Sequence, residues 1–169
     1  MKVLIPKSKI SARVKALAKQ IRADYKDEVP IFIGVLKGSF MFMADLIRDY
    51  GLDCELDFMA LASYGSSRKG SGIIRLIKDI NVNIRKRHVL IVEDIVDSGM
   101  TSNYIRQYLM LRSPKSVEFV VLLDKANARR IDIDIRYIGF KIPNKFVVGY
   151  GLNCAEKYRN FPYIAMYED

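Results

Sequence analysis

The sequence is poor in soft metal ligands. It has one histidine, His88, and two cysteines, Cys54 and Cys154, which are far apart in the chain. This supply of ligands is too small for an ordinary structural zinc site, and no Cys-x-x-Cys redox pair is present. We therefore expect two free, unreactive thiols.

Long apolar runs are also missing, although half of the 169 residues are hydrophobic. No stretch approaches the roughly 20 apolar residues of a transmembrane helix, and the apolar part of residues 1–6 is too short for a signal peptide. No linker or internal repeat divides the chain. We expect a single globular domain, 1–169, that has no membrane segment and works in the cytoplasm.

Basic residues exceed acidic ones, with 28 Lys and Arg against 19 Asp and Glu, so the formal net charge is +9. Such an excess suits nucleic acid, but it equally suits a substrate with several phosphates. The basic residues are scattered, and no aromatic-interleaved RNA-binding signature occurs. The charge alone therefore selects neither kind of partner.

The most informative stretch is 88–101, which reads HVLIVEDIVDSGMT. Residues 89–92 are apolar and mostly β-branched, which is typical of a central strand buried on both faces. Carboxylates and a loop of small and hydroxyl residues follow, before a helical pattern begins. They are Glu93, Asp94 and Asp97, and then Ser98, Gly99, Met100 and Thr101. The stretch predicts a strand, an acidic loop and a helix.

This order of residues suits a phosphorylated sugar bound together with a metal ion. A helix that starts at the carboxyl end of a strand directs free N–H groups at an anion. Gly99 permits a tight loop, and the hydroxyls of Ser98 and Thr101 add donors. The carboxylates would repel a bare phosphate unless they bind sugar hydroxyls or a divalent cation. A Walker A loop is excluded, because no Gly-Lys-Ser/Thr occurs at the required spacing.

The stretch resembles the signature of the type I phosphoribosyltransferases, which bind phosphoribosyl pyrophosphate through paired acids and a short phosphate loop. The resemblance implies that Glu93 and Asp94 hold the ribose hydroxyls and Mg²⁺, and that residues 97–101 wrap the 5′-phosphate. Asp97 is the candidate general acid/base, because a carboxylate there can exchange a proton with N7 of a purine. The plain alternatives are acids that solvate a strand end and a helix cap at Asp97.

Four further motifs extend the resemblance over nearly the whole chain from Ile31 onward. They are Leu36-Lys37-Gly38, Ser63-Tyr64-Gly65, Leu123-Asp124-Lys125, and Lys145-Phe146-Val147-Val148-Gly149-Tyr150 followed by Arg159. Together they narrow the match to the hypoxanthine–guanine phosphoribosyltransferases. In that group the counterparts of Lys37, Gly38 and Arg159 bind pyrophosphate, the Lys-Gly pair often through a cis peptide. A surface turn and a surface charge are the plain alternatives.

The resemblance also assigns the purine site. It implies that Lys125 donates to the 6-oxo oxygen, that Phe146 stacks on the base, and that the backbone of Val147 reads the base edge. A solvated strand end and a core side chain are the plain alternatives for Lys125 and Phe146. Asn153 departs from the family, which usually has Asp near the metal and the 2-substituent. The strength of metal binding and the choice among hypoxanthine, guanine and xanthine therefore stay open.

Residues 63–72, SYGSSRKGSG, form a Gly/Ser-rich stretch between two predicted strands. Flexible loops near a reactive site commonly serve as lids that exclude water. By the resemblance, Ser63 and Tyr64 begin such a lid. An idle hairpin loop is the alternative.

Alternating strand and helix patterns predict an α/β fold with a mostly parallel, twisted sheet flanked by helices. The first helix is expected from Ser11 to Tyr25. The expected strands are 30–36, 54–62, 73–79, 89–92, 115–124, an alternating segment 131–135 continued by 137–140, and 163–166. The resemblance adds a small hood, from about 1–25 and 143–169.

The resemblance implies an enzyme of purine salvage. It would transfer the 5-phosphoribosyl group from phosphoribosyl pyrophosphate to hypoxanthine and guanine, with Mg²⁺, giving IMP and GMP plus pyrophosphate. An RNA-binding regulator on the same fold is the alternative, although Lys125 and Phe146 favour the enzyme. An adenine-specific transferase would have no reason for Lys125. Family members are usually dimers or tetramers, so a homodimer or homotetramer is expected.

Overall fold

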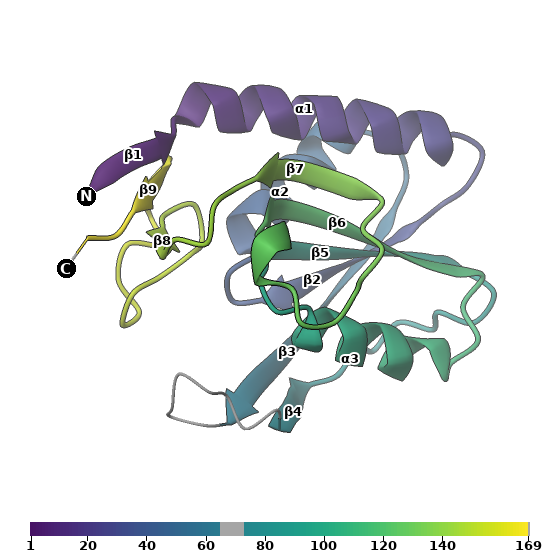
Figure 1. Cartoon of the computed structure of the whole chain (residues 1–169). Helices are drawn as coiled ribbons and strands as arrows, with labels where there is room; N and C mark the ends of the chain where they lie inside the picture. The colour runs from purple at the N-terminus through teal and green to yellow at the C-terminus, as the bar shows by residue number, and fades with distance from the viewer. Residues whose placement is uncertain (65–72, 169) are drawn as a thin grey trace.

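The computed structural model describes residues 1–64 and 73–168 (Figure 1). In chain order the elements are β1 (Lys2–Ile5), α1 (Lys7–Asp24), β2 (Ile31–Leu36), α2 (Phe40–Tyr50), β3 (Glu55–Tyr64), β4 (Ile73–Lys78), β5 (His88–Val96), α3 (Met100–Met110), β6 (Ser116–Asp124), the 3₁₀ turn Ala126–Ala128, β7 (Tyr137–Lys141), β8 (Val147–Val148) and β9 (Ile164–Met166).

The main sheet has the strand order β4-β3-β2-β5-β6-β7. All neighbouring pairs are parallel except β3 with β4, which is antiparallel at the edge. Helices α1 and α3 lie on opposite sides of this sheet (Figure 1). The predicted α/β fold with a mostly parallel sheet flanked by helices is confirmed.

The alternation of side chains along β5 explains the two helical layers. Leu90 and Val92 are fully buried in the core shared with α1 and α2, whereas Val89 and Ile91 are fully buried against α3. Successive side chains of a strand point to opposite faces, so a strand covered on both sides must be apolar throughout. This pattern identified the central strand correctly.

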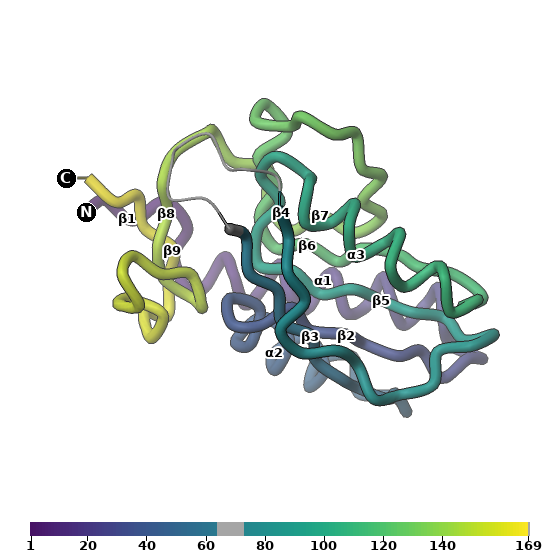
Figure 2. Tube along the Cα trace, turned by 90° about the horizontal axis from the view of Figure 1, so that it is seen from below, coloured from purple at the N-terminus to yellow at the C-terminus, as the bar shows by residue number. Residues whose placement is uncertain are grey.

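A second sheet of three antiparallel strands, β1-β9-β8, lies beside one end of the main sheet (Figures 1 and 2). It joins the two ends of the chain, because Lys2 pairs with Met166. Of the residues 1–25 expected in the hood, β1 lies in this small sheet, whereas α1 packs on the main core. The division of the chain into one domain with a hood stays a prediction.

Two boundaries differ most from the sequence prediction. Helix α1 begins at Lys7 rather than Ser11, because Lys7, Ser8 and Lys9 are polar and exposed, whereas Ile10 is buried and extends the apolar pattern by one turn. Strand β5 continues to Val96, so the predicted acidic loop is wrong for Glu93 and Asp94, and Glu93 pairs with Val121 of β6. Only Asp97 and the residues after it form the loop.

The segment 131–135 is not a strand, although isoleucines and aspartates alternate there. Its chain crosses the loop after β5, where the N–H of Ile131 donates to the carbonyl of Ser98 at 3.1 Å. Ile133 is buried in the core on the α3 side, and the pairing with β6 begins only at Tyr137. The alternation therefore reflects one packed side of a loop.

Both cysteines are free thiols, as predicted. In the described part of the chain, no helix is both long enough and apolar enough to cross a membrane.

Candidate active site

A cleft of about 300 Å³ opens where β2 and β5 end. Its lining combines three predicted groups of residues that are far apart in the sequence. They are Lys37 and Gly38; Glu93, Asp94, Asp97, Ser98, Gly99 and Thr101; and Asn153 and Arg159. Parallel neighbours end at the same edge of a sheet, which is why these loops meet. Ser63, Met100, Lys125, Phe146 and Val147 are not among the described residues that line this cleft, and the side chain of Tyr64 lies outside the described part of the structure.

Glu93 and Asp94 are successive residues of β5, so their side chains leave the strand on opposite faces. Glu93 is buried, and its Oε1 accepts a hydrogen bond from Ser102 Oγ of α3 at 2.7 Å. Burial raises the pKa of Glu93 to about 8, and it raises that of Asp94 to about 6. Ser102 is a buried site residue that the sequence did not reveal, because a serine inside a helix has no local signal.

Asp94 faces the loop that follows β2. A Cβ atom added at Gly38 would lie 1.7 Å from Asp94 Oδ2, so only glycine fits beside this carboxylate. The Leu36–Lys37 peptide of this loop is cis. The N–H of Ile95 donates to Asp94 Oδ1 at 2.9 Å and holds the carboxylate in place. The loop and the acid are therefore fitted to each other.

The predicted phosphate loop leads directly into α3. Gly99 precedes the first helical residue and has a positive φ of 84°. A Cβ atom there would lie 2.6 Å from the carbonyl oxygen of Ile131, so the loop needs glycine for both reasons. The N-cap residue, Gly99, has no side chain, and the N–H of Met100 donates to Ser98 Oγ at 3.4 Å. No other side-chain acceptor for the first turn of α3 is found among the described residues, which leaves its remaining N–H groups available to an anion. The alternative that Asp97 serves as the helix cap is therefore wrong.

Asp97 instead lies beside Lys125. The Lys125 ammonium, whose side chain is 8% exposed, is 3.2 Å from Asp97 Oδ2, whose side chain is 56% exposed. The N–H of Lys125 also donates to the carbonyl of Val96 at 3.0 Å, which fixes the two loops against each other. A buried cation and an accessible carboxylate thus stand side by side at the edge of the cleft.

Phe146 is not a core residue, because it is 54% exposed. Its ring packs edge-on against Tyr167, with 5.8 Å between the ring centroids. Val147 is buried and pairs with Met166 in the small sheet. An exposed aromatic ring held by a neighbour can stack on a planar ligand. Ser63 and Tyr64 end β3, and the rest of the predicted lid, 65–72, lies outside the described residues.

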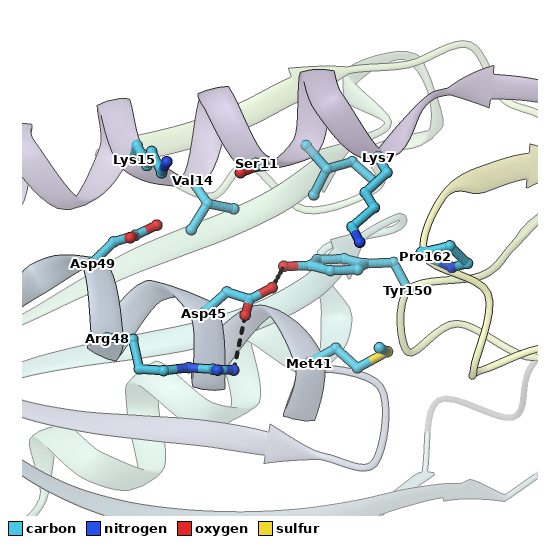
Figure 3. A pocket seen from close by; sticks show the side chains of 11 residues that line it. Lys7, Ser11, Val14, Lys15, Met41, Asp45, Arg48, Asp49, Tyr150 and Pro162 are labelled. Atoms are coloured by element: carbon cyan, nitrogen blue, oxygen red, sulfur yellow. Dashed lines mark hydrogen bonds and ion pairs between the residues drawn. The ribbon is translucent and has the colours of Figure 1, made fainter.

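A larger cavity, of about 440 Å³, lies elsewhere, between α1 and α2 (Figure 3). None of the predicted site residues is among the described residues that line it. Within it Tyr150 donates to Asp45 Oδ2 at 2.6 Å, and Asp45 also pairs with Arg48 at 3.0 Å (Figure 3). The bond ties the segment around Tyr150 to α2, which is the helix that follows the Lys37–Gly38 loop in the chain.

The cleft offers hard oxygen ligands but no dense metal cluster. Within 1–64 and 73–168, no group of three or more His, Cys, Asp or Glu side chains could hold a metal ion. Glu93 and Asp94 supply two carboxylates, and the amide of Asn153 lies in the same lining. Mg²⁺ is commonly held by one or two carboxylates together with the phosphates of a substrate. The residues therefore fit a magnesium ion that arrives with a phosphorylated ligand.

Comparisons with known proteins agree with this chemistry. Residues 5–154 match the model of the phosphoribosyl transferase domain. The chain is 46% identical over 165 residues to the hypoxanthine-guanine phosphoribosyltransferase of Bacillus subtilis, and the match covers 98% of this chain and 92% of the relative.

Two solved structures are also similar. The crystal structure of a hypoxanthine-guanine phosphoribosyltransferase from Bacillus anthracis, with a HEPES molecule in the active site, has a TM-score of 0.95 and 45% identity over 99% of both chains. The hypoxanthine phosphoribosyltransferase of Trypanosoma cruzi, in complex with the product IMP, has a TM-score of 0.91 and 40% identity. That match covers 98% of this chain and 93% of the other.

Proposed function

This chain belongs to the phosphoribosyltransferase family, and we propose from this that it transfers the 5-phosphoribosyl group of phosphoribosyl pyrophosphate to hypoxanthine and guanine. The products are IMP and GMP, together with pyrophosphate. The relatives carry the names of purine salvage enzymes, and nothing in the comparisons supports the RNA-binding regulator.

The observation that carries the proposal is the composition of the cleft. One cavity combines the Lys37–Gly38 loop, the paired acids of β5 and the N-terminus of α3. Pyrophosphate needs cations, and we assign it to Lys37, Gly38 and Arg159. The ribose hydroxyls need hydrogen-bond acceptors, and we assign them to Glu93 and Asp94. The 5′-phosphate needs backbone donors, and we assign it to residues 97–101.

The chemical step follows from this placement. The purine nitrogen forms a bond to the anomeric carbon of ribose as the bond from that carbon to pyrophosphate breaks. Asp97 accepts or returns the proton at N7 of the base, because its carboxylate is accessible at the cleft edge. Lys125 donates to the 6-oxo oxygen, since an ammonium cannot accept a hydrogen bond from an amino group. Phe146 stacks on the base, and the backbone of Val147 reads its edge.

Glu93 and Asp94, with the oxygen of Asn153, would hold Mg²⁺. When bound, the ion would neutralise the charge that develops on the leaving pyrophosphate. The two carboxylates would also stabilise positive charge on the ribose ring in the transition state. Lid closure by Ser63, Tyr64 and the residues that follow, a cytoplasmic location, and assembly into a homodimer or homotetramer stay predictions.

An assay with phosphoribosyl pyrophosphate and Mg²⁺ tests the function directly. Hypoxanthine, guanine, xanthine and adenine are offered separately, and nucleotide formation is measured. We expect turnover of hypoxanthine and guanine and little with adenine, because Lys125 favours a 6-oxo group. Absence of turnover with all four bases would contradict the proposal and favour the regulator.

Gly38→Ala should raise the KM for phosphoribosyl pyrophosphate by about 10- to 100-fold. The added methyl group must displace the carboxylate of Asp94, and a hydrogen bond to a charged group is worth about 1.5–3 kcal/mol. Steady-state kinetics and calorimetry with each substrate measure the effect, and the affinity for free base should stay unchanged. In an Asp94→Ala background, Gly38→Ala should raise the KM for phosphoribosyl pyrophosphate only slightly further. A full additional loss there would show that the methyl group disturbs the loop itself.

Asn153→Asp should lower the Mg²⁺ concentration needed for half-maximal rate, because a hard cation prefers an anionic oxygen. The ranking of guanine and xanthine should also change, since their 2-substituents are a donor and an acceptor. Hypoxanthine, which has no 2-substituent, should change least. Initial rates are titrated with Mg²⁺ for each base in turn. Identical curves for both proteins would remove Asn153 from the site.

A further inference from the structure

Glu156 bridges two cations at the rim of the cleft. Its Oε2 is 3.0 Å from the Lys37 ammonium, and its Oε1 is 3.1 Å from Nη2 of Arg159. Each carboxylate oxygen thus serves one cation. No motif in the sequence points to a role for Glu156. Lys37 and Arg159 are the two side-chain cations that the proposed function gives to pyrophosphate, so the inference below rests on that function.

The ion pair of Glu156 with Lys37 is weaker than the attachment of Arg159 to the protein. The side chains of Lys37 and Glu156 are 68% and 64% exposed, and an ion pair between groups as exposed as these contributes little to stability. Arg159 is held more firmly, because its side chain is only 19% exposed and its Nη1 donates to the carbonyl of Gly151 at 2.7 Å. Arg159 therefore keeps its place when Glu156 leaves.

Arg159 also has an unused donor. Its Nε is buried and has no hydrogen-bond partner among the described residues. Gly151, which accepts from Arg159, packs so closely on the Lys37–Gly38 loop that a Cβ atom there would lie 2.0 Å from the carbonyl oxygen of Gly38. The guanidinium is thus fixed next to this loop. When Glu156 leaves, Nη2 of this fixed guanidinium is free to donate to an oxygen of a ligand.

Glu156 cannot stay in place beside a bound pyrophosphate. Hydrogen bonds from Lys37 and Arg159 lower the pKa of Glu156, so it is ionised at neutral pH. Its negative charge repels pyrophosphate, which carries several negative charges. The carboxylate and the ligand also need the same N–H donors. Binding of one therefore requires the departure of the other.

We propose that Glu156 is an internal counter-ion of the pyrophosphate site. Its carboxylate holds Lys37 and Arg159 in the unliganded protein and is displaced by pyrophosphate or by the pyrophosphoryl group of the substrate. This exchange lowers the affinity for both ligands and favours release of the product pyrophosphate. A purely structural role, in which Glu156 only orients Arg159, predicts the opposite effect on affinity.

Calorimetric titration with magnesium pyrophosphate distinguishes the two roles. Glu156→Gln should bind pyrophosphate about tenfold more tightly than the natural protein, because one charge repulsion and one competing ion pair are lost. The gain should shrink in high salt, which screens exposed charges. Steady-state kinetics should show a lower KM for phosphoribosyl pyrophosphate and stronger inhibition by pyrophosphate.

Glu28→Gln is the matched control. Glu28 also lies between two basic side chains, Lys115 at 2.8 Å and His88 at 3.6 Å, but it lies near the start of β5, whereas the cleft is at its end. This variant removes the same charge and should leave pyrophosphate affinity unchanged. Tighter binding in both variants would mean a general effect of net charge and would overturn the inference.

Two further outcomes separate the inference from the function on which it rests. Equal or weaker binding by Glu156→Gln, in a protein that still binds pyrophosphate and turns over hypoxanthine, would overturn the counter-ion role alone. Failure of the natural protein to bind pyrophosphate would overturn the proposed function together with the inference. In a Lys37→Gln background the gain from Glu156→Gln should fall, because the two residues act as a pair.

Discussion

Asp97→Asn should slow turnover by about 10²- to 10⁴-fold, the usual cost of a lost general acid/base, with the affinity for phosphoribosyl pyrophosphate nearly unchanged. The amide keeps the size of the side chain and can still accept a hydrogen bond from Lys125, 3.2 Å away, but it cannot take a proton from the base. Pre-steady-state kinetics separate the chemical step from binding and product release.

Asp132→Asn is a suitable control, because Asp132 is an exposed acid in the neighbouring 131–135 segment and does not line the cleft. It removes the same charge and should leave the rate of the chemical step unchanged. A helix-capping role for Asp97 would cost about 1 kcal/mol of stability instead, but the structure shows no such cap. An unchanged chemical step in Asp97→Asn would remove this residue from catalysis.

Glu93→Gln should weaken the binding of phosphoribosyl pyrophosphate by about tenfold. The amide NH₂ replaces one oxygen and cannot accept a hydrogen bond from a ribose hydroxyl, and a typical hydrogen bond contributes about 0.5–1.5 kcal/mol. Binding of free hypoxanthine should stay the same, since the base lies nearer Lys125 and Phe146 in the proposed site. Calorimetry with each ligand measures both affinities. Equal loss for the two ligands would indicate misfolding rather than a missing ribose contact.

The same substitution should also change how stability depends on pH. Burial raises the pKa of Glu93 from 4.5 to about 8, so between these values the folded protein keeps a proton that the unfolded chain has released. The contribution of Glu93 to stability is therefore fully present below about pH 4.5 and is lost as the pH rises toward 8. The glutamine side chain does not titrate, so the variant should gain stability relative to the natural protein across this window.

Urea unfolding in EDTA, at about pH 5 and about pH 8, measures this difference, which should reach on the order of a few kcal/mol. A constant offset from the hydrogen bonds of the new amide does not alter the trend with pH. Asp124→Asn provides the contrast, because buried Asp124 already pairs with Arg129, and loss of that partner should destabilise the protein at both pH values. A stability difference for Glu93→Gln that is the same at both pH values would contradict the raised pKa.

The sequence by itself determined the features that depend on neighbouring residues. The apolar run 89–92 identified a strand buried on both faces, because both of its faces must meet a core. Glycine and hydroxyl residues after the acids predicted a tight loop before a helix, since its backbone conformation and donors are local properties. The resemblance then supplied roles for distant residues such as Arg159, which no local pattern could have assigned.

The tertiary structure decided which distant residues meet. Glu93 belongs to β5 rather than to a loop because β6 continues to pair with it, and its partner Ser102 comes from the far side of the phosphate loop. The contact of Glu156 with Lys37 joins residues 119 positions apart. Hydrophobic periodicity shows only which side of an element is buried. Strand order, strand register and the path of the chain after the last strand of the main sheet determine which charged side chains lie in the same cleft.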